Sequence, residues 1–485
     1  MKKRYYYFLF EEGSKINQII CAILVNLPVF AYGASIGWVS PMTLLLKSDD
    51  SPRPTKLTDT EISWMAAAAY IVCVPANILM GYLGDRFGRK PSLLLISSAA
   101  LGCWITKLAS METWAFIFAR SLVGLNMAGC YVTCPLYTKE ISEDSVRGVL
   151  GSLIILFHTT GNLFLFVIGD IVSYNTILWI CLAMPALHII LFLMMPESPS
   201  YLVKKGKLYE AAKALAWLRC RDQDDVEIQN ELNRLRKEKE KDDENTGFAL
   251  KAILSDKILF RAFRIALVVS LAREVCGAVP VLNFAGEIFS LASEGTGIIL
   301  SPNRQAMLLG AVQVAGSAMA SSVVEKAGRK PLLFITSLVS GLSMCALASW
   351  FLARAYQLYA PDWLPIASLC LCIFCDSLGL QPVSVVVTGE IFSFKYRGTV
   401  MAVAMATAAF SDFLQLLFFK PLANAVGIHV AFYFFGAICL LTAIYVILVI
   451  PETKMRSVEE IYEKLKTKKE RELEKKTSKS VVENT

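Results

Sequence analysis

Long stretches of the chain contain no charged residue at all. The longest of these stretches are residues 19–46, 62–84, 171–196, 331–353 and 421–451. A helix crosses the hydrocarbon core of a bilayer with about 20 apolar residues, and each stretch is long enough to do so. With the shorter apolar runs included, the pattern predicts an all-α membrane protein with twelve transmembrane helices. We expect these helices near residues 17–39, 62–83, 92–110, 114–137, 148–169, 176–195, 262–289, 305–324, 331–352, 364–389, 399–419 and 428–450.

The middle of the chain interrupts this pattern. Of the 26 residues 219–244, seventeen are charged, and Ile228, Leu232 and Leu235 recur at helical spacing. This predicts a solvated helix with one apolar stripe, which separates six membrane spans from six. The charged end of the chain is expected to be partly disordered. The predicted domains are a six-helix bundle at 1–203, a cytoplasmic helical linker at 204–257, a second six-helix bundle at 258–452 and a cytoplasmic tail at 453–485.

Composition supports a membrane protein and argues against other classes. The 485 residues are 55% hydrophobic and 18% charged, with a mean hydropathy of +0.51. A soluble protein carries roughly 25% charged residues, so this chain has too little polar surface to cover soluble cores. The net charge of +7 is modest, and the basic residues lie in short connections. This favours the lipid bilayer as a partner and argues against a nucleic acid.

No group of residues indicates catalysis, a metal or a cofactor. The three histidines, His158, His188 and His429, form no triad or metal cluster, and no phosphate-binding glycine loop precedes a predicted helix. Nearly all of the thirteen cysteines lie in apolar spans, where cysteine is a small packing residue. Three cysteines within residues 370–375 have metal-like spacing, but no histidine lies nearby. The sequence therefore predicts no enzyme, no metal site and no cofactor.

The distribution of Lys and Arg predicts the orientation in the membrane. If the N-terminus is cytoplasmic, the short inner connections hold fourteen Lys and Arg, including those at positions 2–4. The outer connections hold seven, namely Lys47, Arg53, Lys56, Lys107, Arg304, Arg354 and Lys420. This bias places both termini in the cytoplasm, and we expect a multi-pass protein of the plasma membrane. An aromatic belt on the outer side is then expected from Trp38, Trp64, Trp114, Trp179, Trp350 and Trp363.

Three motifs recur in register in the two halves. They are GDRFGRK at 84–90 with VEKAGRK at 324–330, Glu140 and Arg147 with Glu390 and Arg397, and PESP at 196–199 with PETK at 451–454. The motifs follow the second, fourth and sixth predicted helix of each half. Such a repeat predicts two pseudo-symmetric six-helix bundles, a plan known from transporters.

The charged residues of these motifs are candidates for a gate on the inner side. Glycines allow a tight turn between two helices, and the flanking acids and bases can pair across the inner face when that side is closed. The gate candidates are Asp85, Arg86, Arg89, Glu140 and Arg147 in the first half and Glu325, Arg329, Glu390 and Arg397 in the second. The alternative is that these residues serve only as positive-inside anchors.

The motifs resemble those of the sugar porter family of the major facilitator superfamily over essentially the full chain. Arg120, Gly124, Pro135, Glu140 and Arg147 reproduce the family's signature on the fourth helix. Within the family, the sequence SIGWVSPM and the Ser- and Pro-rich outer loop most resemble the insect facilitated trehalose transporter group. The resemblance implies the major facilitator fold, alternating access and uptake of a sugar down its gradient. It also adds Arg120 to the gate candidates.

Most of the polar sugar-binding positions of this family are replaced here. The fifth-helix Gln falls on Ile155, and the seventh-helix Gln pair falls on Arg273 and Glu274. The eighth-helix Asn falls on Gln313, which keeps an amide, and an eleventh-helix Asn falls on Asp412. Each hydrogen bond to a sugar contributes about 0.5–1.5 kcal/mol, so losing several would weaken sugar binding by orders of magnitude.

Arg273, Glu274, Asp376 and Asp412 lie within predicted membrane spans. A charge at mid-membrane costs roughly 2.5–3.5 kcal/mol, so it faces a cavity or a partner. These groups either contact the substrate or carry a proton, or they form structural pairs such as Arg273 with Asp376. Together with Gln313 and Ile155, they form the candidate substrate site.

Three functions remain open from the sequence. The first is a facilitative transporter of a sugar, either trehalose or hexose-like. The second is a transporter of another small polar solute on the same scaffold, with or without proton coupling. The third is a sensor that keeps the fold without transport. The first helix carries no carboxylate, whereas proton-coupled relatives have an Asp there, which favours uniport. The single His158 is interpreted as a packing residue. The oligomeric state is not predicted.

Overall fold

Helices account for all regular secondary structure in the described part of the chain. A computed structural model describes residues 13–243, 249–294, 297, 299–392 and 394–466. Among these residues, twelve helical spans are long and apolar enough to cross a membrane, which confirms the predicted all-α membrane protein with twelve spans. The basic residues 2–4 and most of the predicted tail, 467–485, lie outside the described residues.

The first group of membrane helices uses the chain up to residue 192. Its helices are α1 (Ile16–Gly37), α2 (Val39–Lys47), α3 (Asp59–Arg86), α4 (Arg89–Ala109), α5 (Thr113–Ile141), α6 (Asp144–Ile171) and α7 (Tyr174–Phe192). The short helix α2 continues α1 directly after Trp38, whose backbone dihedral angles are also helical.

The second group repeats this plan with two breaks inside its spans. Its helices are α12 (Lys257–Glu274), α13 (Ala278–Ser293), α14 (Pro302–Ala327), α15 (Arg329–Ala355), α16 (Leu364–Cys375), the π-helical segment η1 (Asp376–Leu380), α17 (Gln381–Ile391), α18 (Phe394–Val426) and α19 (Ile428–Leu448). The predicted seventh span is thus broken between α12 and α13, and the predicted tenth span is broken at η1.

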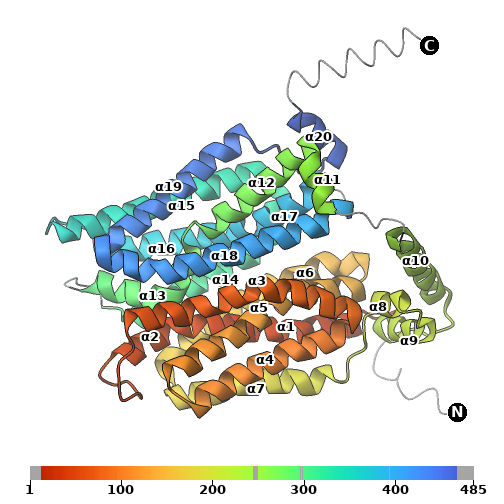
Figure 1. Cartoon of the computed structure of the whole chain (residues 1–485), viewed down its shortest axis with the longest axis horizontal. Coiled ribbons are helices and arrows are strands. Elements are labelled where there is room, and N and C mark those ends of the chain that lie inside the picture. Colours follow the sequence, from red (N-terminus) through yellow and green to blue (C-terminus); the bar gives the residue numbers. More distant parts are fainter. Residues whose placement is uncertain (1–12, 244–248, 295–296, 298, 393, 467–485) are drawn as a thin grey trace, which may run out of the picture.

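Five shorter helices lie outside the membrane spans. They are α8 (Pro199–Lys204), α9 (Leu208–Arg219), α10 (Val226–Asp243), α11 (Ala249–Ser255) and α20 (Val458–Leu465). The predicted apolar stripe of the charged region is present, because Ile228 and Leu232 of α10 are buried against α8 and α9, with Leu235 packed beside them. Figure 1 shows these helices together at one end of the molecule, here called the linker end. The other end, where α2 lies, is called the α2 end.

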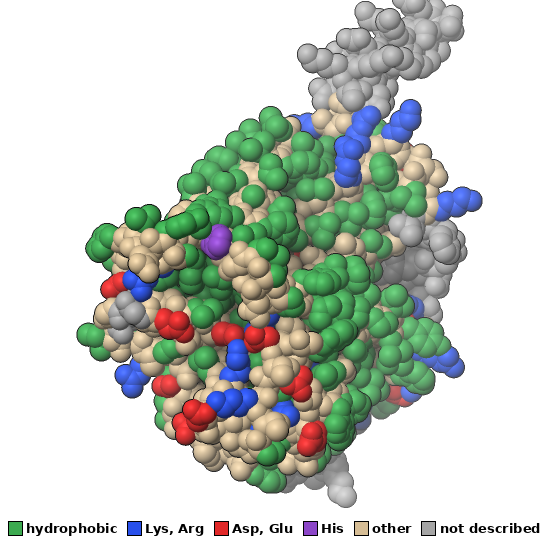
Figure 2. Space-filling model, turned by 60° about the vertical axis from the view of Figure 1, so that its left-hand side comes forward, with side chains coloured by type: hydrophobic (Ala, Val, Ile, Leu, Met, Phe, Trp, Pro, Cys, Tyr) green, Lys and Arg blue, Asp and Glu red, His purple; other side chains and the backbone are tan. Residues whose placement is uncertain are grey.

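The two groups of membrane helices lie side by side along the long axis (Figure 1). We call them the first and second halves. They pack together mainly through α3 against α18, α6 against α14, and α2 against α13. Hydrophobic side chains cover the flank of the molecule between its two ends (Figure 2). Such a belt suits contact with lipid, because hydrocarbon tails are the only solvent there.

Local sequence explains where several helices begin. Thr58 and Glu61 form a reciprocal capping box at the start of α3, since each side chain accepts a hydrogen bond from the other residue's backbone N–H. Gly88 and Gly328 have φ of +115° and +89° at the turns before α4 and α15, a region that favours glycine. The repeated GRK motifs therefore place the same turn in both halves.

Three sequence assignments change in the structure. Lys107 lies inside α4 and is fully buried, with Nζ 3.6 Å from the ring centre of Trp38. Lys420 lies inside α18 and is also buried, so neither lysine belongs to a connecting loop. Trp38 and Trp350 are buried and cannot form part of an aromatic belt, whereas the other four tryptophans of the predicted belt are exposed.

Candidate functional site

A cavity of about 70 Å³ lies between the two halves, midway along the membrane helices. The first half contributes residues of α1, α3, α5 and α6, and the second half contributes residues of α12, α13, α14, η1, α17 and α18. This volume holds several water molecules. The polar and charged side chains that line it are Tyr32, Tyr70, Asn77, Tyr131, His158, Arg273, Glu274, Asn283, Gln313, Asp376, Gln381 and Asp412.

Irregular backbone borders the cavity at two places in the second half. The helix α12 ends at Glu274, and Gly277 then adopts a φ of +88° before α13 begins. A Cβ at Gly277 would lie 2.6 Å from Cδ2 of Phe435, so a larger residue has no room there. The π-helical turn η1 starts at Asp376. Irregular backbone at membrane depth is tolerated where it lines a cavity, as it does here.

Arg273, Glu274, Asp376 and Asp412, the charged residues of the predicted substrate site, all line this cavity. Arg273 forms an ion pair with the adjacent Glu274, and the structure does not show the pair of Arg273 with Asp376 that the sequence suggested as an example. Cys276 donates a weak thiol hydrogen bond to Asp376 over 3.8 Å. One oxygen of Asp412 is buried without a hydrogen-bond partner.

Amide and aromatic side chains complete the lining. Asn162 on α6 donates a hydrogen bond of 2.9 Å to Gln313 on α14, which joins the two halves beside the cavity. Asn283 on α13 donates to the hydroxyl of Tyr70 on α3 over 3.4 Å. The rings of Tyr32 and His158 stack with 5.0 Å between their centres.

The structure brings together five of the six residues predicted for the substrate site. Ile155 is the exception, because it is half-buried on α6 and does not line the cavity, whereas His158, one helical turn later, does. The family's sugar-binding position therefore identified the correct helix, α6, but not the face of that helix that lines the cavity. The sequence reading also missed the tyrosines of α1, α3 and α5 and the amide of Asn283, although polar side chains within apolar spans are the signal that could have identified them.

Hydrogen bonds and ion pairs close the α2 end between the two halves. Lys47 of α2 pairs with Asp59 at 2.9 Å and with Glu287 of α13 at 3.0 Å. Lys420 of α18 lies 3.1 Å from the same Asp59 and 2.5 Å from Glu287, and Asn424 also donates to Asp59. We call these five residues the α2-end network. Figure 2 shows basic and acidic side chains interleaved on this end of the molecule.

At the linker end, the predicted gate residues pair within each half. Arg89 forms ion pairs with Glu140 at 3.1 Å and with Asp85 at 3.0 Å, all in the first half. Arg329 pairs with Glu390 at 2.7 Å in the second half. Among the hydrogen bonds and ion pairs between described residues, those that join the halves lie at the α2 end and around the cavity.

The PESP and PETK motifs supply one more carboxylate to each of these clusters. Glu197 accepts from the backbone N–H groups of Arg89 and Lys90 at the start of α4. Glu452 accepts in the same way from Arg329 and Lys330 at the start of α15. Backbone N–H groups at a helix start attract a negative charge. Glu197 therefore links the end of the sixth span to the first GRK turn, and Glu452 links the end of the last span to the second.

The two glutamates differ in their electrostatic surroundings. Burial raises the pKa of the Glu197 carboxyl above its usual value, against the effect of the backbone N–H groups that donate to it. At Glu452 burial acts in the same direction, but the N–H groups of Lys454, Arg329 and Lys330 outweigh it, and the pKa is lowered.

The remaining gate candidates occupy other positions. Arg147 and Arg397 donate to the carbonyl oxygens of Ser142 and Phe392, at matching places in the two halves. Arg86 contacts the Tyr82 hydroxyl, and Glu325 is exposed.

Arg120 does not belong with the gate candidates at the linker end. Its guanidinium is fully buried and donates to the carbonyl oxygens of Ser35, Met65 and Ala66, near the α2 end. The assignment to an inner gate was wrong because twenty helical residues, about 30 Å, separate Arg120 from Glu140.

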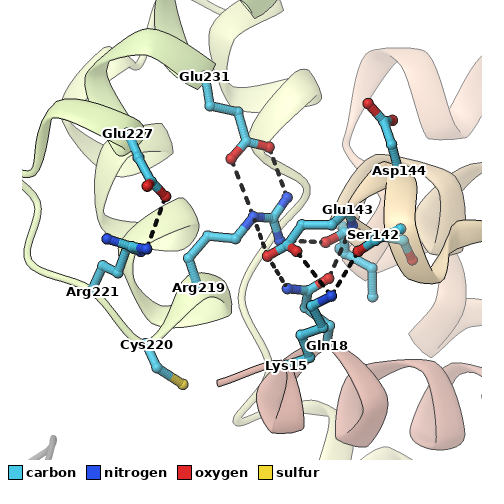
Figure 3. Close-up of polar contacts among 12 residues, drawn as sticks. Lys15, Gln18, Ser142, Glu143, Asp144, Arg219, Cys220, Arg221, Glu227 and Glu231 are labelled. Atoms are coloured by element: carbon cyan, nitrogen blue, oxygen red, sulfur yellow. Dashed lines mark hydrogen bonds and ion pairs between the residues drawn. The ribbon is translucent and has the colours of Figure 1, made fainter. Parts of the chain in front are cut away.

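A further polar cluster fastens the linker helices to the first half (Figure 3). Arg219 at the end of α9 forms a two-point ion pair with Glu231 of α10, at 2.7 and 3.1 Å, and donates to the carbonyl oxygen of Ile141 at the end of α5. Gln18 of α1 donates to Glu143, which also lies 3.5 Å from Arg219. The cluster therefore joins α1, α5, α9 and α10.

The arrangement defines a class of protein: a polytopic membrane transporter with two six-helix halves around a central cavity. Residues 20–465 match the family described as "Sugar (and other) transporter", so the chain belongs to that family. The "Facilitated trehalose transporter Tret1" of Bombyx mori is 28% identical over 452 residues, which cover 93% of this chain and 87% of that protein.

Two further comparisons agree with this placement. The protein of the same name from Aedes aegypti is 26% identical over 451 residues, and the chain spans only 55% of its length. The inward open structure of the xylose transporter XylE from E. coli aligns with a TM-score of 0.73 at 19% identity, covering 92% of this chain and 99% of that one. This likeness confirms the major facilitator fold.

Proposed function

We propose that the protein is a facilitative transporter that moves a trehalose- or hexose-like sugar across the membrane by alternating access. One observation carries this proposal: a polar cavity lies between the two halves, and bonds between the halves close it at the α2 end. Opening one end while the other closes is how such a cavity passes a solute. The Tret1 relatives, named for trehalose, support a sugar as the solute.

The polar and charged side chains that line the cavity are the proposed solute contacts. Gln313, Asn283 and Gln381 offer amides that can bond hydroxyl groups, while Arg273 and the nearby carboxylates supply charge. Uniport is favoured because the described part of α1 carries no carboxylate.

We place the linker end in the cytoplasm of a cell whose plasma membrane holds the protein. The excess of Lys and Arg in the short connections at that end supports this orientation. The α2-end network then forms the outer gate, and this conformation is closed to the outside. Arg89 pairs with Glu140, and Arg329 pairs with Glu390, so helix ends are held together within each half. These pairs let the described parts of the predicted bundles at 1–203 and 258–452 move as rigid units.

Uptake into vesicles tests the proposed function. The purified full chain is placed in liposomes, and entry of labelled trehalose, glucose and a polyol is followed at two pH values against protein-free liposomes. We expect saturable uptake that equilibrates without accumulation and is equal at both pH values. Accumulation driven by a proton gradient would show proton coupling, and the absence of any uptake would support a sensor.

A further inference from the structure

The charges that line the cavity do not balance. The lining includes one guanidinium, that of Arg273, and three carboxylates, those of Glu274, Asp376 and Asp412, all on the second half. Each carboxylate side chain is at least 95% buried. Arg273 is paired with Glu274, which leaves Asp376 and Asp412 without an ion pair among the described residues.

The two remaining carboxylates have few hydrogen-bond donors. Asp376 accepts from the thiol of Cys276, which is a weak donor, and Oδ1 of Asp412 is buried without any partner. A buried carboxylate that lacks a partner is costly, so the site favours a positive charge that enters the cavity. No three His, Cys, Asp or Glu side chains of the described residues converge as metal ligands would. A metal ion is therefore a poor fit for this charge.

The opposite wall of the cavity is aromatic. Tyr32, Tyr70 and Tyr131 come from three helices of the first half, and His158 of α6 stacks on Tyr32. Tyr131 meets the Tyr32 ring edge-on, with 6.0 Å between the ring centres. Ring faces attract ammonium groups, and a carboxylate opposite an aromatic wall suits a protonated amine better than a neutral hydroxyl.

We propose that the transported solute carries a positively charged nitrogen, which Asp412 and Asp376 bind against the tyrosine wall. The amides of Asn77, Asn283 and Gln313 remain for hydroxyl groups, so the fitting class is an amino sugar or another polyhydroxylated amine. This inference rests on the proposed transport function and names the solute class for the same cavity.

Binding and uptake of matched sugars test the proposal. Glucosamine, N-acetylglucosamine and glucose differ at one substituent, and only glucosamine carries an ammonium group. With the purified full chain, we expect glucosamine to bind at least about tenfold more tightly than the other two, as hydrogen bonds to charged groups imply. Asp412→Asn should remove this preference, whereas Asp49→Asn, at an exposed loop carboxylate, should keep it.

The outcomes separate the amine proposal from the function on which it rests. Equal binding of the three sugars to the wild-type protein would overturn the amine proposal, even if all of them are transported. Uptake of glucose together with a proton, lost in Asp412→Asn and without a preference for glucosamine, would also overturn it, because a proton would then supply the charge. Tight glucosamine binding without uptake of any sugar would keep the amine site and refute transport.

Discussion

Nζ of Lys420 lies 2.5 Å from a carboxylate oxygen of Glu287, with the two residues on different helices of the second half. The same lysine reaches Asp59 of the first half, and the same glutamate reaches Lys47. Two lysines and two acids therefore alternate around the α2 end. Because each charge contacts partners in both halves, separating the halves breaks several ion pairs at once.

Removing Lys420 should shift the protein towards a state that is open at the α2 end. In Lys420→Met, Asp59 and Glu287 keep only Lys47 as an ion-pair partner, and the closed state should lose about 1–3 kcal/mol relative to the open one. Spin labels at the exposed Thr55 and Tyr359, one in each half, should report longer distances. The charge swap Lys420→Glu with Glu287→Lys should open this end further, because it places an acid against Asp59 and a base against Lys47 and so turns both attractions between the halves into repulsions.

Lys56 provides the matched control for this experiment. It pairs with Asp49 at the same end, but both residues are exposed in one loop of the first half. Lys56→Met should leave the label distances unchanged. If it shifts them as much as Lys420→Met does, the effect reflects general loss of positive charge and not a bond between the halves.

Sequence reasoning recovered what local pattern specifies. Uncharged runs identified the twelve spans, and the repeated motifs identified matching turns at Gly88 and Gly328. Charges inside apolar runs must face a cavity or a partner, so Arg273 and Asp412 could be assigned to the cavity before any fold was known.

The features that sequence reasoning missed depend on contacts between distant segments. Lys420 and Asp59 are 361 positions apart, and nothing near either residue indicates the other. Lys420 was assigned to a loop because an apolar run ends beside it, whereas α18 continues to Val426. The π turn at Asp376 lies in a predominantly apolar span, where hydrophobic periodicity cannot mark a break.

Substituting Gly277 should damage both stability and transport. In Gly277→Ala, a side chain would occupy backbone with a φ of +88° and would contact the Phe435 ring, at a cost of about 1–3 kcal/mol. The shift would also displace the end of α12, which carries Arg273 and Glu274 into the cavity. Thermal unfolding in detergent and vesicle uptake measure the two effects.

Gly389→Ala is the control, because a Cβ there meets no atom within 4 Å. A helical glycine gains up to about 1 kcal/mol on change to alanine, so this variant should be as stable as the wild type or more stable. Equal losses in both variants would contradict the role assigned to Gly277.

Arg219→Met should release the linker helices from the first half. The side chain is buried and bonds to Glu231 and to the Ile141 carbonyl oxygen, so its removal leaves both acceptors without their donor. We expect faster hydrogen exchange in α9 and α10 and no change in α20, which packs on the second half. Lys207→Met, which removes an exposed pair with Glu210, should leave exchange in α10 as it is. If hydrogen exchange in α9 and α10 stays as slow in Arg219→Met as in the wild type, apolar packing alone holds these helices against the first half.

The repeated glutamates Glu197 and Glu452 should give pH dependences of opposite sign. The raised pKa of Glu197 means that the folded state binds its proton more tightly than the unfolded state, where the value is about 4.3. Its contribution to stability is therefore fully present below about pH 4.3 and is lost as pH rises through the folded-state value. The lowered pKa of Glu452 gives a contribution that is present above about pH 4.3 and lost as pH falls.

Thermal unfolding of Glu197→Gln and Glu452→Gln across a pH series measures these contributions. The stability of the wild type minus that of Glu197→Gln should fall as pH rises from acid to neutral, because ionising a half-buried carboxylate is unfavourable. The same difference for Glu452→Gln should rise with pH, since the backbone N–H groups at the start of α15 stabilise its charge. Parallel profiles would mean that the two halves hold their PESP and PETK carboxylates in equivalent surroundings, and they would contradict the opposite pKa shifts of Glu197 and Glu452.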